Sequence, residues 1–257
     1  MAPRPKKLSE KAIEVLGSME VIGNQARIMA GQLDRPLYLE VNAALEALGG
    51  KWDKKSKTHL FEGNPLDTLD QVVVDGEFSN EVRDFEFFET PPEVTSKLLG
   101  VLELKPGDLV LEPSCGDGAL IGAVLTKEPK VEVQAYEARD TAAKKTQERF
   151  ASKGVKVKNG NFLDEKPNPR FKFVVMNPPF GRQADIDHVL HAHGFLKAKG
   201  KLVAVMSASV KFRTNRKTVE FRDFVESHGG SIEPLPTGSF KSSGTNVNTC
   251  LVMIPRN

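Results

Sequence analysis

From about Val94 onward, short apolar runs with the character of β-strands alternate along the chain with amphipathic helical stretches. The strand-like runs are residues 109–111, 131–136, 155–157, 171–176, 201–206, 231–235 and 247–254, and helical stretches lie between most of them at 119–126, 138–153, 185–197 and 219–228. This alternation predicts an α/β fold, a mostly parallel seven-stranded sheet with helices on both faces. A loop without a helix joins the last two strands, so we expect an antiparallel pair at one edge.

Residues 1–85 have a different pattern. The segment 8–33 has helix-like apolar spacing, and 37–48 is a second, shorter amphipathic stretch that Gly49 and Gly50 end. Residues 51–61 are typical of two short strands around a basic turn. We therefore expect a small amino-terminal helix-plus-hairpin module over residues 1–85, with Trp52 as a core anchor rather than a stacking platform, and a larger domain over 86–257.

Composition restricts the class of protein. The chain is 39% hydrophobic and 27% charged, as in ordinary globular proteins, and no apolar run approaches the ~20 residues of a membrane helix. The basic amino terminus has no apolar segment behind it, so we expect no secretory signal. Two cysteines, Cys115 and Cys250, are too few for a disulfide scaffold or a Cys-rich zinc site. We expect a cytoplasmic protein, a monomer or dimer without a membrane partner or a metal.

The net charge is only +2, but Lys and Arg gather in residues 4–11, 51–57 and 211–222. Each cluster alone could be a solvated face. Together they favour a polyanionic partner, because local basic patches are what phosphate backbones attract.

Unusual residue groups follow the first three strands of the predicted sheet, where ligands of parallel sheets bind. The first strand is followed by Glu-Pro-Ser-Cys-Gly-Asp-Gly at 112–118, whose glycines allow a sharp turn close to a ligand, although a plain strand-to-helix turn with Asp117 as the cap would look the same. Glu137 ends the second strand and could accept hydrogen bonds from a ribose. Phe162 and Asp164 follow the third strand and suit an adenine ring, although Phe162 could equally be core. Together they indicate a nucleoside-shaped site.

The fourth strand is followed by Asn177-Pro178-Pro179-Phe180-Gly181. The two prolines hold the backbone extended and lack amide hydrogens, while their carbonyl groups remain as acceptors. The Asn177 side-chain oxygen and the Pro178 carbonyl can therefore accept the two N–H bonds of a planar amino group and draw its nitrogen toward a nucleophilic form. Phe180 could stack on the planar substrate, an interaction worth on the order of 1–3 kcal/mol for a base.

These groups resemble motifs I to IV of class I S-adenosylmethionine-dependent methyltransferases of the amino-methylating branch: 112–118, Glu137, Asp164 and 177–180. Upstream, residues 88–93 (Phe-Glu-Thr-Pro-Pro-Glu) resemble motif X of the DNA N6-adenine enzymes, in the gamma-like order X, I, IV. The resemblance covers about residues 85–257 and implies a Rossmann-like class I methyltransferase fold. Residues 37–61 resemble an amino-terminal module of phage and plasmid methyltransferases.

The resemblance implies a role for each matching position. Asn177 and Pro178 would grip the target amine, and Phe180 would stack on the target base. S-adenosylmethionine would be the cofactor, held by Phe88, Thr90, Pro91, Glu112, Pro113, Ser114, Cys115, Gly116, Gly118, Glu137, Phe162, Asp164 and Asn177. No metal or covalent intermediate would be needed. A base inside a duplex would have to flip out, at a cost of a few kcal/mol.

Two departures from the family pattern stand out. Cys115 replaces a common glycine, and we expect a small packing residue rather than a nucleophile. About 77 residues follow Phe180, too few for a separate carboxy-terminal target-recognition domain. Target contacts must then come from the amino-terminal module or from the basic insert 211–217, and the insert's candidates, if it is not simply a solvated loop, are Lys211, Arg213, Arg216 and Lys217.

The function that this resemblance implies is methylation of the N6 amine of an adenine flipped out of double-stranded DNA. The same four-residue motif also occurs in RNA adenine-N6 and guanine-N2 methyltransferases, and a variant ending in tyrosine methylates glutamine in release factors. Phe180 and motif X favour DNA over these alternatives. A DNA-binding accessory protein with a vestigial site is a third hypothesis, which the intact motifs disfavour.

Overall fold

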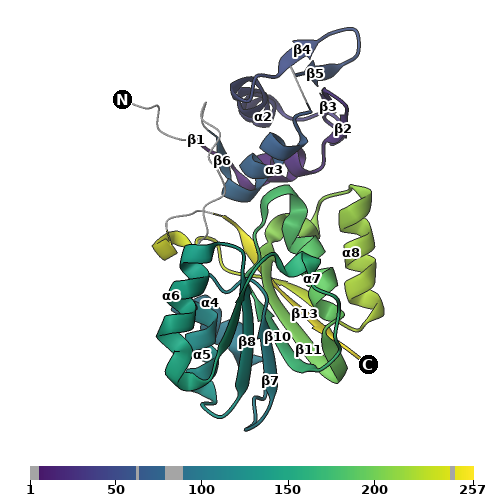
Figure 1. The fold of residues 1–257 in the computed structure, drawn as a ribbon. Helices are drawn as coiled ribbons and strands as arrows, with labels where there is room; N and C mark the ends of the chain where they lie inside the picture. Colours follow the sequence, from purple (N-terminus) through teal and green to yellow (C-terminus); the bar gives the residue numbers. More distant parts are fainter. Residues whose placement is uncertain (1–5, 62–63, 79–88, 244–246) are drawn as a thin grey trace.

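The computed structural model describes residues 6–61, 64–78, 89–243 and 247–257. A seven-stranded sheet in the order β12-β13-β11-β10-β7-β8-β9 forms the larger part (Figure 1). Only β13 runs antiparallel to its neighbours, β11 and β12, and this confirms the predicted fold class and its antiparallel edge. The strands are β7 Leu109–Glu112, β8 Glu132–Glu137, β9 Lys156–Asn159, β10 Phe171–Met176, β11 Leu196–Ser207, β12 Ser231–Pro234 and β13 Thr249–Pro255.

Helices cover both faces of this sheet, since its central strands are apolar on both sides. Along β10, Phe173 and Val175 pack in one buried cluster, while Val174 and Met176 pack in the other. This is the period of two that an extended strand imposes on its side chains. The first cluster takes apolar residues from α4 Pro92–Gly100, α5 Ala119–Lys127 and α6 Asp140–Phe150, and the second from α7 Ala184–His193 and α8 Arg216–Ser227.

The boundary between α7 and β11 differs from the sequence expectation. The helix ends at His193 instead of reaching residue 197, and β11 begins at Leu196 instead of 201. The carbonyl oxygen of Phe195 accepts hydrogen bonds from the amides of Arg170 (3.0 Å) and Phe171 (3.1 Å), so the sheet draws this segment out of the helix. Pairing with a neighbouring strand has overridden the local helical pattern.

The amino-terminal module lies over the carboxyl ends of the parallel strands (Figure 1). A four-stranded sheet of order β2-β3-β5-β4 packs with three helices around a separate apolar cluster. Its elements are α1 Glu10–Gly17, β2 Glu20–Ile22, β3 Gln25–Arg27, α2 Arg35–Ala47, β4 Lys51–Asp53, β5 Thr58–Leu60 and α3 Leu66–Asp75, and β1 Lys6–Lys7 pairs with β6 Glu77–Phe78. The two strands expected within 51–61 are β4 and β5.

The expectation of helical structure through residues 8–33 is wrong beyond Gly17. The chain ends α1 there and forms the β2–β3 hairpin, in which Ile22 pairs with Gln25 across a two-residue turn. Gly23, with φ 59°, supplies the positive φ that such a tight hairpin turn requires. Apolar residues from both kinds of element, such as Leu16 of α1 and Ala26 of β3, pack in the module core, while Ile22 beside the turn is exposed.

Trp52 is not the core anchor that the sequence suggested. Its side chain is 43% exposed and lies edge-on to the ring of His59, its cross-strand partner, with 5.1 Å between the ring centroids. His59 is fully buried, and its Nε2 is 2.9 Å from Asn42 Oδ1. The tryptophan thus covers a buried histidine and leaves part of its ring open to solvent.

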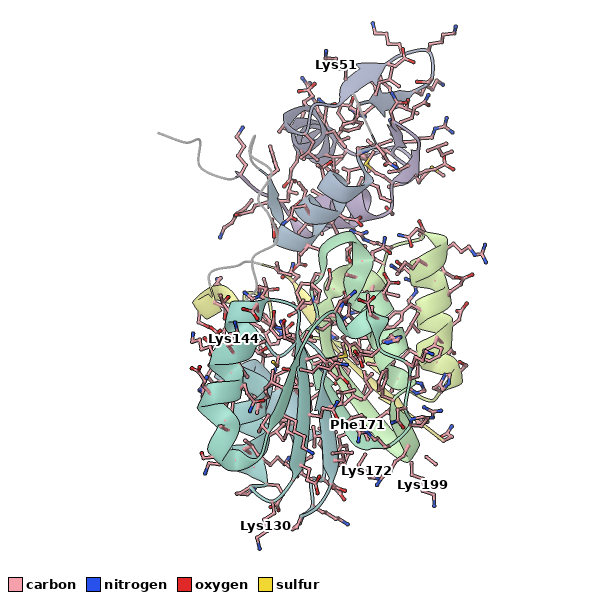
Figure 2. All side chains as sticks on the ribbon, viewed as in Figure 1. Lys51, Lys130, Lys144, Phe171, Lys172 and Lys199 are labelled. Atoms are coloured by element: carbon pink, nitrogen blue, oxygen red, sulfur yellow. The ribbon has the colours of Figure 1, made fainter. Side chains whose placement is uncertain are left out.

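The hairpin β4–β5 and the amino ends of the large sheet mark opposite ends of the molecule. Figure 2 shows Lys51 at the end of the module remote from the sheet, and Lys130, Lys172 and Lys199 at the other end. Among the described residues, no helix is long and apolar enough to cross a membrane.

Candidate active site

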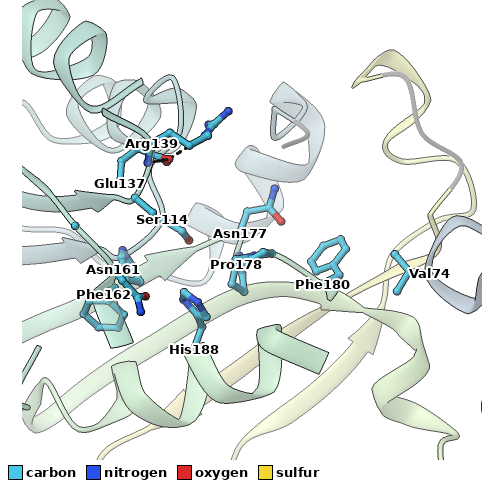
Figure 3. Close-up of a pocket in the computed structure, with 14 residues that line it drawn as sticks. Val74, Ser114, Glu137, Arg139, Asn161, Phe162, Asn177, Pro178, Phe180 and His188 are labelled. Atoms are coloured by element: carbon cyan, nitrogen blue, oxygen red, sulfur yellow. Dashed lines mark hydrogen bonds and ion pairs between the residues drawn. The ribbon is translucent and has the colours of Figure 1, made fainter. Parts of the chain in front are cut away.

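A cavity of about 700 Å³ lies where the strand order reverses, between β7 and β10. Ligands of open α/β sheets bind at such a switch point, beyond the carboxyl ends of the strands. The lining comes from the segments after β7, β8, β9 and β10, as Figure 3 shows, with contributions from α3 and α7. The lining residues are Val74, Pro113, Ser114, Glu137, Ala138, Arg139, Gly160, Asn161, Phe162, Asn177, Pro178, Pro179, Phe180 and His188.

The loop after β7 needs its glycines. Gly116 and Gly118 have φ values of 50° and 83°, in the left-handed region that favours glycine. A Cβ atom on Gly118 would also lie 2.5 Å from Phe150 on α6, so a larger residue would collide there. Asp117 does not cap α5, because its carboxylate pairs with Lys145 at 3.2 Å. The loop is therefore held close against α6.

Glu137 holds this loop from the end of β8. Its carboxylate accepts hydrogen bonds from the Gly116 amide (2.8 Å) and from the backbone and Nε of Arg139 (2.9 Å each). A carboxylate offers about four lone-pair sites, so roughly one remains for a ligand. A second site becomes free if the Arg139 guanidinium moves away. The Arg139 side chain is 51% exposed.

Glu112, at the end of β7, is buried beneath the same loop and accepts a hydrogen bond from the Ser114 amide (3.1 Å). Burial raises the pKa of this carboxyl to about 8, and the negative charge of Glu137 adds to the rise. The Ser114 amide opposes it. Glu112 does not line the cavity itself; it lies directly behind residues that do.

The raised pKa predicts a stability change with pH. Between its ordinary pKa of 4.5 and about pH 8, folded Glu112 holds a proton that the unfolded chain releases, so the free energy of unfolding falls as pH rises through this window. In Glu112→Gln this contribution is absent. Urea unfolding at pH 5.5 and pH 8.5 should therefore show the variant gaining stability relative to the wild type at the higher pH. Exposed Glu132→Gln is the control, and parallel profiles for all three proteins would contradict the prediction.

Asn177 lies at the carboxyl end of β10, buried beside motif X. Its Nδ2 donates a hydrogen bond to Thr90 Oγ1 at 3.0 Å, across 87 positions of sequence. Thr90 is 6% exposed, and its carbonyl accepts a hydrogen bond from Thr95 Oγ1 at 3.4 Å. This contact fixes the rotation of the Asn177 carboxamide, and it joins the segment that holds Thr90 to the segment that follows β10.

Residues 178–180, which follow Asn177, form one wall of the cavity. Pro178 is buried, Pro179 is exposed, and Phe180 is half-buried between the cavity and the apolar cluster of the sheet. Val74 of α3 lies beyond Phe180 (Figure 3), so the amino-terminal module closes this end of the cavity.

Phe162 lines the cavity but belongs to the core. It is 2% exposed and packs against Tyr136 and Phe195, with ring-centroid distances of 5.2 and 4.9 Å. Little of its ring is therefore available to a ligand, and the exposed Asp164 does not line the cavity. Asn161 and His188 line it instead.

Six lining residues were not predicted from the sequence as site residues: Val74, Ala138, Arg139, Gly160, Asn161 and His188. His188 is on α7, and burial lowers the pKa of its ring to about 4, so it is neutral near pH 7. Within the described part of the chain, neither His188 Nδ1 nor Ser114 Oγ has a hydrogen-bond partner. A helical histidine and an ordinary valine carry no motif that marks them.

The remaining expected cofactor residues are placed as follows. Thr90 and Pro91 line a second cavity, of about 860 Å³, between α4 and α5, and Phe88 lies outside the described residues. Cys115 is 3% exposed, and burial raises the pKa of its thiol, so it has the character of a packing residue.

Arg213 requires a correction. It is buried rather than exposed, and its guanidinium forms an ion pair with buried Asp70 of α3, so it is not available to a phosphate. Arg216 is exposed but paired with Glu220 (2.6 Å), and Lys217 is paired with Asp187 (2.7 Å). Lys211 remains exposed. Through Arg213, the insert therefore attaches α3 of the amino-terminal module to the domain that contains the seven-stranded sheet.

The strand order, the glycine loop and the cavity at the switch point define a Rossmann-like fold of the methyltransferase class. A dimethyladenosine transferase structure from Plasmodium falciparum has a similar fold: the TM-score is 0.50 at 17% identity, over 66% of this chain and 64% of that one. Residues 92–228 match the family model of the methyltransferase small domain. The chain belongs to this family of methyltransferase domains, with S-adenosylmethionine as the cofactor that the sequence resemblance implied.

One curated relative is similar over part of its length. The modification methylase CviBIII of Paramecium bursaria Chlorella virus NC1A is 33% identical over 96 residues. The match covers 36% of this chain and spans about a quarter (25%) of the relative's length.

The cavity residues fit this cofactor. Ser114 Oγ is a buried hydroxyl that lines the cavity without a partner among the described residues, and Glu137 is a carboxylate at a strand end. The volume of about 700 Å³ is within the range of small-molecule sites.

Proposed function

We propose that this chain transfers a methyl group from S-adenosylmethionine to the exocyclic N6 amine of adenine in DNA. One observation supports this most directly: Asn177, Pro178 and Phe180 line the same cavity as Ser114 and Glu137. The residues proposed to hold the target amine thus line the same cavity as residues suited to a nucleoside. The partial likeness to a viral modification methylase favours DNA as the substrate.

The cofactor's nucleoside portion would lie against the segments after β7, β8 and β9. Glu137 would accept hydrogen bonds from the ribose hydroxyls, and the exposed Arg139 guanidinium would swing away to free a lone pair for the second of them. Asn161 and the edge of Phe162 would meet the adenine, and neutral His188 would offer a ring nitrogen there. The Ser114 hydroxyl would form a hydrogen bond with another polar group of the cofactor.

The target amine would be held by Asn177 and Pro178. Pro178 and Pro179 have no amide hydrogen, so this corner presents acceptors and no backbone donor to the amine's two N–H bonds. The hydrogen bond from Asn177 to Thr90 presets the carboxamide, which reduces the entropy lost when the substrate binds.

The cofactor supplies a methyl group already activated by its positive sulfur, so the protein's task is alignment. Phe180 would stack on the target base and hold it in the plane that the two acceptors require. Val74 and Phe180 bound that end of the cavity with apolar surface and exclude water from it.

The proposal is tested by offering the chain tritiated S-adenosylmethionine with duplex DNA, ribosomal RNA or release factor as the acceptor. We expect label in the DNA, recovered as N6-methyladenine after digestion. Label only in RNA or only in protein would reject the proposed substrate while leaving the methyltransferase assignment intact.

A further inference from the structure

The basic residues 51–57 lie on an exposed β-hairpin. Lys51, Lys54, Lys55 and Lys57, here named the hairpin lysines, are all exposed, and none forms an ion pair with another described residue. They lie on or between β4 and β5, at the end of the module remote from the sheet (Figure 2). Four unpaired cations on one short hairpin form a local positive patch.

The one acidic residue of this hairpin is engaged within its turn. Asp53 accepts hydrogen bonds from the Ser56 amide (2.8 Å) and hydroxyl (2.6 Å), and these bonds lower the pKa of its carboxyl. The Ser56 and Thr58 hydroxyls are 2.7 Å apart, and Lys57 adopts φ 54°. The hairpin lysines therefore lie on an ordered turn, and the Asp53 carboxylate does not pair with them.

The basic insert 211–217 and the helix after it differ in this respect. Arg213, Arg216 and Lys217 are paired with Asp70, Glu220 and Asp187, as described above. Arg222 donates to the carbonyl oxygens of Val210 and Arg213, at 2.8 Å each. The hairpin and the insert are both rich in basic residues, but most cations of the insert are paired, while the hairpin lysines are not.

An aromatic hollow adjoins the hairpin lysines. Its volume is about 580 Å³, and Trp52, Tyr38, Arg27 and Lys57 are among its lining residues. Trp52 is 43% exposed and Tyr38 is 36% exposed. Exposed aromatic rings beside cations suit a polyanion that also carries planar groups, which is the chemistry of a nucleic acid.

The same module contributes to the catalytic cavity at its opposite end. Val74 of α3 lines that cavity, and the buried Asp70–Arg213 pair attaches α3 to the sheet domain. A ligand held on the hairpin is therefore held by a body that is fixed relative to Asn177.

We propose that the β4–β5 hairpin binds the DNA substrate, with the hairpin lysines on phosphates and Trp52 against a sugar or base. The inference rests on the proposed function and deepens it, because it assigns the substrate's backbone to the amino-terminal module. The contact is chiefly electrostatic, so binding weakens as salt rises, with a slope of about −0.9 per phosphate neutralised.

The test compares two charge-reversed variants of the full chain that carry the same net charge. Lys54→Glu with Lys55→Glu alters the hairpin, and Lys130→Glu with Lys199→Glu alters the opposite end of the molecule (Figure 2). The dissociation constant of a fluorescent DNA duplex is measured by anisotropy between 50 and 200 mM salt. We expect the hairpin variant to bind at least about tenfold more weakly at low salt, with a slope shallower by about 2, and the control to bind like the wild type.

Trp52 provides an independent measurement. Trp52→Ala should weaken DNA binding by about 5- to 150-fold, which is the loss of one stacking contact, and Trp52→Phe should weaken it less. In methyl transfer the hairpin variant should raise KM for DNA and leave kcat unchanged. Cofactor binding, measured by calorimetry, should stay as in the wild type.

Equal weakening in both charge-reversed variants would overturn the inference, because net charge alone would then explain the loss. An unchanged KM and salt slope in the hairpin variant, with a wild type that methylates DNA, would overturn it and leave the proposed function standing. A wild type that binds DNA through the hairpin but never methylates it would contradict the proposed function and support the hairpin contact.

Discussion

Asn177→Ala is expected to lower the rate of methyl transfer by at least about 10²-fold while S-adenosylmethionine still binds. Alanine removes the side-chain oxygen that would accept a hydrogen bond from the target amine, and loss of one preorganised polar contact at a reacting centre costs about 10²–10³ in rate. The cofactor's nucleoside portion would be held by Ser114 and Glu137, which the substitution leaves in place. Single-turnover transfer to DNA measures the first effect, and calorimetry with the cofactor measures the second.

Two further variants sharpen this test. Asn177→Asp keeps an acceptor oxygen and should retain more activity than the alanine variant. Thr90→Val removes the hydroxyl that accepts from Asn177 Nδ2, so it should lower the rate by an intermediate amount through a looser carboxamide. Full activity in Asn177→Ala, or a loss of rate that merely follows lost cofactor affinity, would exclude a direct role for this side chain.

Arg213→Met is expected to destabilise the packing of the amino-terminal module on the sheet domain by about 3–5 kcal/mol. Arg213 is 2% exposed and Asp70 is 3% exposed, so the substitution deletes one member of a buried ion pair. For a chain of this size, that loss lowers the thermal midpoint by roughly 6–20 °C. Differential scanning calorimetry measures it.

The chain offers a matched control and a local probe for this second prediction. Arg216→Met breaks an exposed pair with Glu220 and should leave the midpoint unchanged within experimental error. Adding Asp70→Leu to Arg213→Met should restore most of the lost stability, because both members of the buried ion pair are then replaced by apolar side chains. Trp52 is the single tryptophan and lies in the module, so its fluorescence shows whether the module detaches first. Equal midpoints for Arg213→Met and Arg216→Met would mean that the buried pair does not anchor the module.

The sheet could be predicted closely because its strands are buried on both faces. Residues such as Val174 and Val175 of β10 pack in opposite clusters, and this leaves a continuous apolar run in the sequence. The site segments followed from the same logic, since the ends of parallel strands meet at one edge of a sheet. Sequence order therefore placed Ser114, Glu137 and Asn177 in the lining of one cavity.

The features that the sequence did not reveal depend on contacts between distant segments. Arg213 looks like any basic loop residue until Asp70, 143 positions earlier, is placed beside it. Val74 has no chemical signature at all, and it lines the cavity only because α3 is docked there. Segment 8–33 misled for a local reason, because its apolar spacing fits a helix while the turn at Gly23 favours a hairpin.

The docking of α3 bears on how such a chain can be divided or recombined. Excising residues 6–78 would remove Val74 from the cavity lining and Asp70 from its pair with Arg213, so the remainder would have a more open cavity and a less stable fold. Grafting a foreign module onto residues 89–257 would succeed only if the graft brought a carboxylate to Arg213 and an apolar side chain opposite Phe180.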